Sequence, residues 1–534
     1  MDKVLEFDYV VIGGGAGGCV IAARLAAESS GRVALLERGR MDDNRWLRVP
    51  GAFFKVLKSR DLESVISEPD RTLNGKPFIV RQGRVLGGGS SINGMVYMRG
   101  QAQDYDDWES LHGCTGWGYR DVLPVFKRQE KNTRLNNKYH GVSGKLIVDD
   151  PVLPHPVSEK ILDAALGVGL PKSNDFNGAS QDGAGWYQVT AHKGLRQSAA
   201  DCFLRPEVEN DALTVLTEHH VSRICFKNRR AVAVEAFDAS GLRILFRAAR
   251  EIILCAGSFH SPKLLMLSGI GRSPDLLRFG INVVQDSPEV GANFQDHVGT
   301  PVIYRLKKKI GLHGSDYGLK ALKHGMNYFG FKRGLLTANL LQAGACVDTS
   351  GSGRPDVQFN FAPFAPSTPG SQPIGHHAMQ IHPMIMRPKS RGRIGLNSRS
   401  PFEMPKLLTT ALEQEHDMDV LRRGIRLARG ICAQPVLREI LSEEVWPGLG
   451  TSSAIKSSSL DCAIRRHART MFHPAGTCRM GGDERSVVDP QLRVRGVDGL
   501  RVADCSIMPN LVSGNTNAPT MMIADRCADF ILGA

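Results

Sequence analysis

The feature that most constrains the fold is a glycine-rich loop close to the N-terminus. Residues 9–12 (Tyr-Val-Val-Ile) form a short β-branched run, which is typical of a buried parallel strand. The loop 13–18 follows this run, residues 19–28 have the apolar spacing of a helix, and residues 33–36 predict a second strand. A strand, a glycine turn, a helix and a parallel strand in immediate succession form a βαβ unit, so the sequence predicts an α/β fold.

The spacing of the loop glycines predicts a dinucleotide site. Gly13, Gly15 and Gly18 fit the pattern G-x-G-x-x-G. The first glycine allows the tight turn, the second lets a diphosphate approach the backbone, and the third lets helix and strand pack closely. Glu37 ends the next strand, where a carboxylate can accept hydrogen bonds from an adenosine ribose. Arg38 follows it and would suit a 2′-phosphate, so NADP stays an alternative to FAD.

Further segments with motifs typical of cofactor binding lie far apart along the chain of 534 residues. They lie near residues 83–100, within 213–300 and after 465, which predicts one domain assembled from separated pieces. The predicted nucleotide-binding domain comprises residues 1–150, 213–300 and 465–534, and the predicted inserted domain comprises residues 151–212 and 301–464. Further strands are expected at 213–216, 231–236, 251–254 and 500–503, and helices at 158–166 and 418–431.

Charge and cysteine content limit the partners and the compartment. Lys and Arg exceed Asp and Glu by 67 to 54, but the 7% of aromatic residues do not cluster with the basic runs, so we do not expect nucleic-acid binding. Docking to an anionic membrane surface stays open. The eleven cysteines lack metal-ligand spacing, which predicts free thiols and no metal site. Without a signal-peptide pattern or an apolar run long enough to span a bilayer, we expect a cytoplasmic protein.

Three more motifs follow in order. The second is G-R-V-L-G-G-G-S-S-I-N-G at 83–94, and the third is G-S-F-H-S-P-K-L-L-M-L-S-G-I-G at 257–271. The fourth is F-H-P-A-G-T-C-R-M-G at 472–481, after which come V-A-D at 502–504 and G-N-T-N-A-P-T at 514–520. Glycines in such loops let the backbone wrap closely around a flat, bulky cofactor.

With these four motifs in this order, the chain resembles the glucose–methanol–choline (GMC) oxidoreductase family over essentially its whole length. It looks most like bacterial choline-dehydrogenase-like and L-sorbose-dehydrogenase-like members. The resemblance implies a Rossmann-like FAD-binding domain of discontinuous segments and an inserted substrate-binding domain that contains an antiparallel sheet. Some relatives bond FAD covalently through a histidine at the position of Ile92. Isoleucine cannot do this, so we predict dissociable FAD.

The resemblance also implies the cofactor contacts. It places Asn93 and Gly94 beside the reactive edge of the flavin and Asp504 near the ribityl chain. The backbone of Val221 would meet adenine, although Val221 could equally be an ordinary strand residue. A helix that begins near Pro519 would direct its positive end at the flavin. The predicted cofactor-binding residues are Gly13, Gly15, Ala16, Gly18, Glu37, Arg38, Arg84, Gly88, Ser90, Ser91, Asn93, Gly94, Val96, Val221, Gly257, Ala503, Asp504, Asn515 and Thr520.

Two residues are predicted to be catalytic. Oxidation of an alcohol removes a hydroxyl proton and a carbon-bound hydride, and FAD accepts the hydride at N5. Histidine suits the proton, because its reference pKa near 6.5 leaves much of it neutral. The resemblance makes His473 this base, with His297, in the motif at 293–297, as an architectural rival. Asn517 matches the second catalytic position, where its amide would bind the substrate oxygen; capping of the next helix is the alternative.

We therefore predict an FAD-dependent alcohol dehydrogenase that acts on a primary alcohol, a polyol or a sugar alcohol, with a quinone or oxygen as acceptor. Choline dehydrogenase, an oxygen-using alcohol oxidase, a flavin-containing hydroxynitrile lyase, an NAD(P)-dependent dehydrogenase and a non-catalytic flavin module remain alternatives. Recognition of choline favours a carboxylate beside an aromatic cage. No such cluster stands out in the inserted domain, so a neutral alcohol is preferred over choline.

Overall fold

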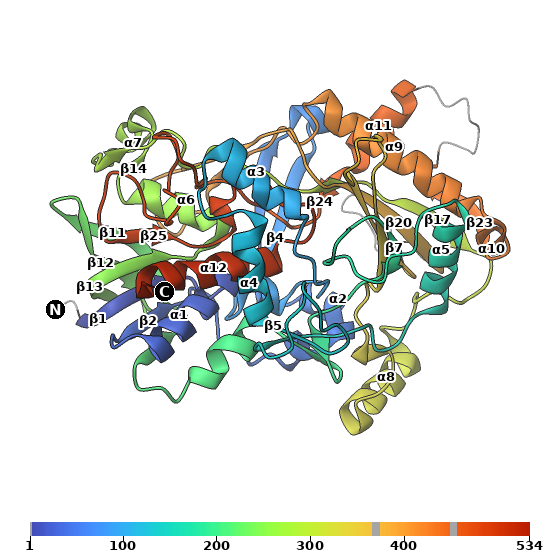
Figure 1. The fold of residues 1–534 in the computed structure, drawn as a ribbon, viewed down its shortest axis with the longest axis horizontal. Coiled ribbons are helices and arrows are strands. Elements are labelled where there is room, and N and C mark those ends of the chain that lie inside the picture. The colour runs from blue at the N-terminus through green and yellow to red at the C-terminus, as the bar shows by residue number, and fades with distance from the viewer. Residues whose placement is uncertain (1–2, 366–373, 449–456, 534) are drawn as a thin grey trace.

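A seven-stranded sheet forms the core of one lobe of the computed structural model, which describes residues 3–365, 374–448 and 457–533 (Figure 1). The strand order is β10 (Leu213–Leu216), β2 (Val33–Leu36), β1 (Lys3–Ile12), β13 (Arg243–Leu254), β12 (Arg230–Phe237) and β11 (His220–Lys227), with β25 (Leu500–Val502) also paired to β13. The pairs from β10 to β13 and the pair with β25 are parallel, whereas β12 and β11 are antiparallel. The predicted α/β fold is confirmed.

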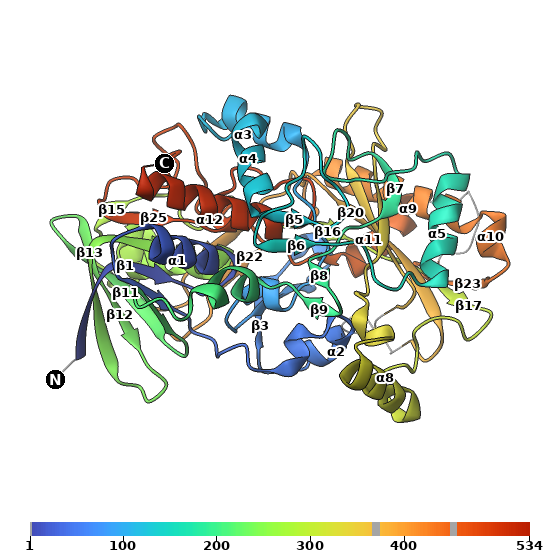
Figure 2. The same cartoon turned by 60° about the horizontal axis from the view of Figure 1, so that its bottom comes forward.

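The glycine loop leads from β1 into helix α1 (Ala16–Glu28), which lies against the C-terminal helix α12 (Asn517–Leu532) (Figures 1 and 2). Val10, Val11 and Ile12 are buried, as expected for parallel strands that are covered on both faces. Pro519 falls in the first turn of α12, where its missing N–H breaks no helical hydrogen bond.

The predicted strands are present, but two of them extend well beyond the predicted bounds. β2 and β10 have the expected bounds, whereas β1 begins at Lys3 and β13 at Arg243. The additional halves pair with each other, from Lys3 opposite Ile244 to Phe7 opposite Ala248. Most of their residues are partly or fully exposed, so these halves lack the continuous apolar run by which a buried strand is recognised.

An antiparallel sheet forms the second lobe, as the predicted fold class requires. Its strand order is β23 (Leu441–Trp446), β17 (Val302–Leu306), β20 (Ala378–Ile385), β19 (Val357–Ala362), β18 (Ala343–Val347) and β7 (Gly183–Trp186). Helices α5 (Pro156–Gly167) and α9 (Glu415–Cys432) pack on this sheet, and both contain the helices predicted from periodicity (Figure 1).

Two short strands extend the antiparallel sheet into segments that the sequence assigned to the other domain. β16 (Val298–Gly299) pairs with β20 and with β24 (Arg469–Thr470). These strands lie just inside the predicted boundaries at residues 300 and 465. The domain boundaries therefore stay a prediction. The pairing of β24 with β16 attaches the motif at 472–481, which follows β24, to the second sheet.

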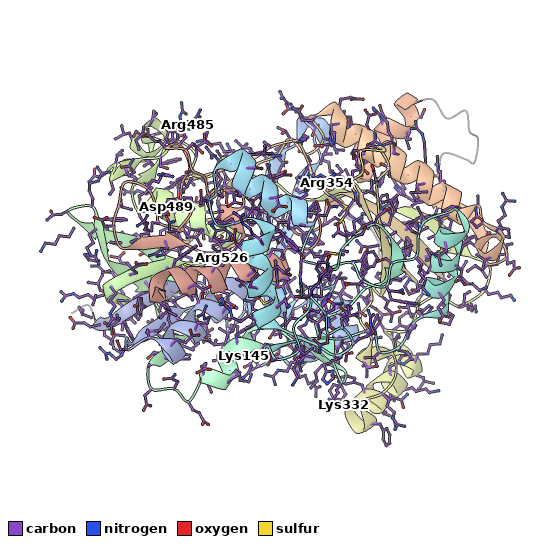
Figure 3. All side chains as sticks on the ribbon, viewed as in Figure 1. Lys145, Lys332, Arg354, Arg485, Asp489 and Arg526 are labelled. Carbon is purple, nitrogen blue, oxygen red and sulfur yellow. The ribbon has the colours of Figure 1, made fainter. Side chains whose placement is uncertain are left out.

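Helix α8 (Gly318–Phe331) projects from the body of the molecule beside the short helix α2 (Phe53–Val56) (Figures 1 and 2). Lys332, which follows its last residue, is labelled at that end in Figure 3. Neither α8 nor any other helix of the described residues combines the length and apolarity needed to cross a bilayer.

Candidate active site

A cavity of about 640 Å³ is lined by residues of both sheets, and most of the predicted site residues face it. Its volume is within the usual range for ligand pockets. The predicted residues along its wall are Gly13, Gly15, Ala16, Glu37, Arg38, Gly88, Asn93, Gly94, Val96, Val221, Gly257, His473, Asp504, Asn515, Asn517 and Thr520. The cavity therefore brings together residues from opposite ends of the chain, such as Gly13 and Thr520.

Five predicted cofactor residues are absent from this wall: Gly18, Arg84, Ser90, Ser91 and Ala503. The hydroxyls of Ser90 and Ser91 donate to the carbonyls of Gly87 and Leu86 at 2.6 and 2.8 Å, so they close the second glycine loop on itself. A Cβ on Gly18 would lie 1.8 Å from the carbonyl oxygen of Gly13, which explains why only glycine fits there. Gly18, Ser90 and Ser91 therefore support the loops behind the wall, and direct contact with a cofactor stays a prediction for all five residues.

The nucleotide end of the cavity fits a diphosphate. A Cβ added to Gly15 would meet no atom within 4 Å, so the backbone here faces open space at the start of α1. The N–H groups of such a helix start attract a phosphate. Beside it, the carboxylate of Glu37 accepts the N–H groups of Gly14 and Gly39 at 2.7 and 2.5 Å, and burial raises its pKa. Two oxygens held in this way can still accept ribose hydroxyls.

The surroundings of Arg38 favour FAD over NADP. The guanidinium of Arg38 is bound to Glu63, and its Nη2 lies 3.1 Å from Nε2 of His260. Recognition of a 2′-phosphate needs a guanidinium that is free to pair with it. Arg38 already has an anionic partner, and the neighbouring Glu37 would repel a phosphate.

The second glycine loop is held by a residue that sequence analysis missed. Oδ1 of Asn93 accepts hydrogen bonds from Met95 N at 3.0 Å and from Arg196 Nη1 at 2.6 Å. Arg196 is buried, and burial lowers its pKa to about 9. It carries no motif signal because its contact with Asn93 joins segments 103 residues apart. On the other side of the cavity, Asp504 accepts the N–H of Gly257 at 2.9 Å.

The segment 293–297 holds the loop that carries His473. Oδ1 of Asp296 accepts the backbone N–H of His473 at 2.9 Å, and its other oxygen accepts the hydroxyl of Thr470. Burial raises the pKa of Asp296 to about 7. Phe472 adopts a left-handed backbone with φ of 65°, an uncommon conformation that functional sites often contain. The predicted architectural role of this segment agrees with these contacts.

The tautomer of His473 follows from the groups around His297. Nε2 of His297 lies 3.0 Å from the carbonyl oxygens of Met386 and Val512, and because both only accept, Nε2 must donate. Burial lowers the pKa of His297 to about 4, so the ring is neutral and its Nδ1 carries no hydrogen.

His473 must therefore donate from its own Nδ1, which lies 2.9 Å from Nδ1 of His297. This leaves Nε2 of His473 unprotonated, with a lone pair that can accept a hydrogen bond or a proton. Burial, followed by the neighbouring His297, lowers the pKa of His473 well below its usual value. The arrangement supplies a neutral imidazole whose unprotonated nitrogen can take up a proton.

The amide beside this nitrogen belongs to Asn515. Nδ2 of Asn515 lies 3.0 Å from Nε2 of His473, and its Oδ1 accepts a hydrogen bond from Gln358 at 3.4 Å. Asn517 is the first residue of α12 and lines the same cavity, but its side chain bonds no other described residue. Asn515 is predicted to contact the cofactor and Asn517 the substrate, and the spacing of the two residues does not reveal which amide contacts His473.

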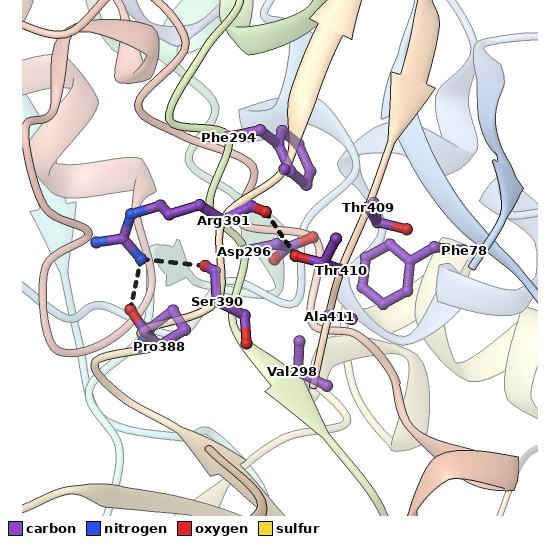
Figure 4. Close-up of a pocket in the computed structure, with 11 residues that line it drawn as sticks. Phe78, Phe294, Asp296, Val298, Pro388, Ser390, Arg391, Thr409, Thr410 and Ala411 are labelled. Carbon is purple, nitrogen blue, oxygen red and sulfur yellow. Dashed lines mark hydrogen bonds between the residues drawn. The ribbon is translucent and has the colours of Figure 1, made fainter. Parts of the chain in front are cut away.

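A second pocket lies beyond Asp296, away from this cavity (Figure 4). It holds about 20 Å³, enough for roughly one water molecule. Figure 4 shows the Arg391 guanidinium donating to the carbonyls of Pro388 and Ser390 and the Thr410 hydroxyl donating to the carbonyl of Arg391. Its size excludes it as a substrate site.

Comparisons with known proteins agree with this geometry. The N-terminal and C-terminal family models of GMC oxidoreductases match residues 7–299 and 388–524. The chain is 38% identical to an alcohol dehydrogenase (acceptor) of Pseudomonas putida, with 98% of this chain and 96% of that protein aligned. It is also 38% identical to the mitochondrial choline dehydrogenase of Homo sapiens, over 99% of this chain and 90% of that one.

A solved structure of similar fold is pyridoxine 4-oxidase from Mesorbium loti, with a TM-score of 0.88, 27% identity and 98% of each chain covered. Formate oxidase superposes with a TM-score of 0.90 at 25% identity, over 99% of each chain. Family models, full-length relatives and fold agree, and the cavity fits the expected cofactor. The chain therefore belongs to the GMC oxidoreductase family of FAD-dependent enzymes that act on CH–OH groups.

Proposed function

We propose that the protein oxidises a primary alcohol, a polyol or a sugar alcohol to the carbonyl compound, with His473 as the proton acceptor. The observation that carries this proposal is the unprotonated Nε2 of His473, which lines the cavity and accepts a hydrogen bond from the amide of Asn515. Bound FAD supplies the acceptor for the hydride. The loop at Gly13–Ala16, Glu37, the second glycine loop and Asp504 would hold the cofactor. Ile92 lines the cavity without a group that can form a covalent link, which supports dissociable FAD.

The protein residues handle the proton and the orientation of the substrate. Nε2 of His473 takes the hydroxyl proton, and the imidazolium that forms stays bonded to His297 through Nδ1. The amides of Asn515 and Asn517 can donate to the alcohol oxygen but cannot act as bases near neutral pH. Anaerobic addition of an alcohol to the FAD-loaded protein tests the proposal. Bleaching of the flavin supports alcohol oxidation, whereas a lyase would leave the flavin oxidised.

We expect His297 to be a positioning residue. His297→Leu removes the acceptor for the Nδ1–H of His473. The tautomer of His473 that leaves Nε2 unprotonated is then no longer favoured, and kcat should fall about ten- to a hundredfold. His297→Gln keeps one acceptor and one donor and should recover most of the rate. The measurement is the rate of anaerobic flavin reduction at saturating alcohol, with the FAD content of each variant checked first. Equal rates in the two variants would show that His297 only fills space.

The face of α8 supports contact of this enzyme with a membrane. Leu319, Leu322 and Met326 lie at helical spacing along one stripe and are 84%, 60% and 64% exposed. Tyr328 anchors the helix to the body, because it is buried and its hydroxyl donates to the carbonyl of Gly194 at 2.8 Å. An apolar stripe of this kind on an anchored helix is typical of segments that lie in a bilayer interface.

Charge favours an anionic lipid surface over a second copy of the chain as the partner of α8. Lys320, Lys323, Lys332 and Arg333 lie in and just after the helix, and Asp316 is the one acidic residue in the segment 311–340. Basic residues near an anionic bilayer contribute about 1 kcal/mol each, whereas two such faces would repel each other. A surface-docked enzyme would reach a quinone acceptor dissolved in the bilayer. The eleven unpaired cysteines support a cytoplasmic location.

The double variant Leu322→Glu/Met326→Glu should lose binding to vesicles that contain phosphatidylglycerol. The wild type should float with these vesicles and not with pure phosphatidylcholine vesicles, because both apolar area and positive charge are required. Leu111→Glu is the matched control, since Leu111 is also exposed but lies on a distant helix. The account of α8 is wrong if the double variant floats like the wild type, or if it instead dissolves a dimer seen by light scattering.

A further inference from the structure

A guanidinium without an anionic partner lies in the substrate half of the cavity. Arg469 belongs to β24, four residues before His473, and lines the cavity. Its Nη2 contacts only neutral groups, Oε1 of Gln380 at 3.4 Å and Nδ1 of His382 at 3.2 Å. No described carboxylate forms an ion pair with it, and the sequence has no Asp or Glu in 366–373 or 449–456.

Arg469 is charged in this position. Burial lowers its pKa to about 10, which still leaves the guanidinium protonated at neutral pH. His382 cannot share the charge, because burial and then Arg469 itself lower the pKa of His382 well below its usual value. A charge removed from water is costly unless an opposite charge compensates it, so this cation favours an anion in the cavity.

The wall around Arg469 is polar but not acidic. Asn360 on β19 is opposite His382 on β20, and both line the cavity together with Gln380. Oδ1 of Asn360 is buried without a hydrogen-bond partner among the described residues. The acidic residues on the cavity wall are Glu37, Glu63 and Asp504, and each is already bonded at the nucleotide end. The described wall around Arg469 therefore supplies no carboxylate that balances its charge.

We propose that the substrate is an alcohol that also carries a carboxylate, and that Arg469 binds this carboxylate while His473 receives the hydroxyl proton. This inference rests on the proposed alcohol oxidation and names its substrate class. A guanidinium pairs with a carboxylate through two parallel N–H···O bonds. The single positive charge of the guanidinium neutralises a carboxylate. A phosphate monoester would carry a second negative charge that Arg469 alone cannot neutralise. The charge of Arg469 also repels the quaternary ammonium of choline, which further separates this site from one for choline.

Binding of ligands that cannot be oxidised tests the inference without turnover. Butanoate, butanamide and tetramethylammonium are titrated into the FAD-loaded wild type, and binding is followed by the flavin spectrum and by Tm. Butanoate should bind at least tenfold more tightly than butanamide, and tetramethylammonium should not bind. Arg469→Gln should abolish the preference for butanoate, Arg469→Lys should keep part of it, and Arg466→Gln, which changes an exposed arginine nearby, should leave it unchanged.

The outcomes separate this inference from the proposed function. Equal binding of butanoate and butanamide to the wild type would overturn the inference, even if Arg469→Gln failed to fold. Flavin reduction by a neutral alcohol but not by hydroxy acids would overturn it and leave alcohol oxidation standing. Failure of every alcohol, charged or neutral, to reduce the flavin would instead refute the proposed function. Faster reduction by a hydroxy acid than by the matching neutral alcohol, lost in Arg469→Gln, is the expected result.

Discussion

His473→Gln should retain FAD and lose about 10²–10⁴-fold in kcat, equivalent to about 3–5 kcal/mol of transition-state stabilisation. Glutamine keeps a polar group near the cavity but has no nitrogen that can take up a proton at neutral pH. The loss follows from the lone pair on Nε2 of His473, which His297 and Asn515 position. Anaerobic stopped-flow reduction of the flavin at saturating alcohol measures it directly.

Asn515→Ala and Asn517→Ala are the controls for this prediction. Each removes a hydrogen-bond donor and leaves the base in place, so each should lose less than His473→Gln. The pH dependence gives a second readout. Because the pKa of His473 lies well below its usual value, the neutral base predominates across the physiological range. The rate should therefore stay level as pH falls to about 6.5 and decline only below it. Near-wild-type rates for His473→Gln would refute its assignment as the base.

Gly15→Ala should fold normally and weaken FAD binding about a hundredfold or more, equivalent to at least about 2.7 kcal/mol. The backbone of Gly15 is extended, with φ of −76°, so alanine introduces no strain. The added Cβ meets no protein atom within 4 Å. It would instead occupy the space through which a diphosphate approaches the backbone. Equilibrium dialysis of the apoprotein against FAD, with circular dichroism to monitor folding, measures the effect.

Gly430→Ala is the matched control. Gly430 lies inside α9, and its added Cβ also meets no atom within 4 Å. Alanine there should leave FAD binding unchanged and raise the free energy of unfolding by up to about 1 kcal/mol, as expected for glycine replaced in a helix interior. If Gly15→Ala bound FAD as tightly as Gly430→Ala, the diphosphate could not lie against the loop at 13–16.

The sequence predicts those parts of the fold and the site that depend on residues close together in the chain, such as short apolar runs and the spacing of glycines. β2 has the predicted bounds because it is a short apolar run buried in a parallel sheet, and the partly buried edge strand β10 has them too. The loop at Gly13–Gly18 needs glycine partly because of close contacts between residues near in sequence, such as Gly18 and Gly13. The spacing of its glycines could therefore predict the nucleotide site. β20 was not predicted, since Gln380 and His382 interrupt its apolar residues and face the cavity.

The contacts that define the site depend on residues far apart in the chain. His297 and His473 are 176 residues apart, and Arg196 reaches Asn93 across 103 residues. A single sequence contains no signal for a residue that lies outside every motif and reaches the site from far along the chain, as Arg196 and Arg469 do. Which of Asn515 and Asn517 lies beside His473 is a question of a different kind. Two amides in one short turn satisfy the same pattern, and the turn geometry alone decides which one meets the imidazole.

Anaerobic titration of the FAD-loaded protein with a panel of neutral alcohols and hydroxy acids tests the central claim most directly. The account predicts that the visible absorption of the flavin is lost as one equivalent of aldehyde or ketone forms per FAD, and that His473→Gln slows this loss without changing the FAD content. A protein that retains FAD but stays oxidised with every alcohol in the panel would contradict the account.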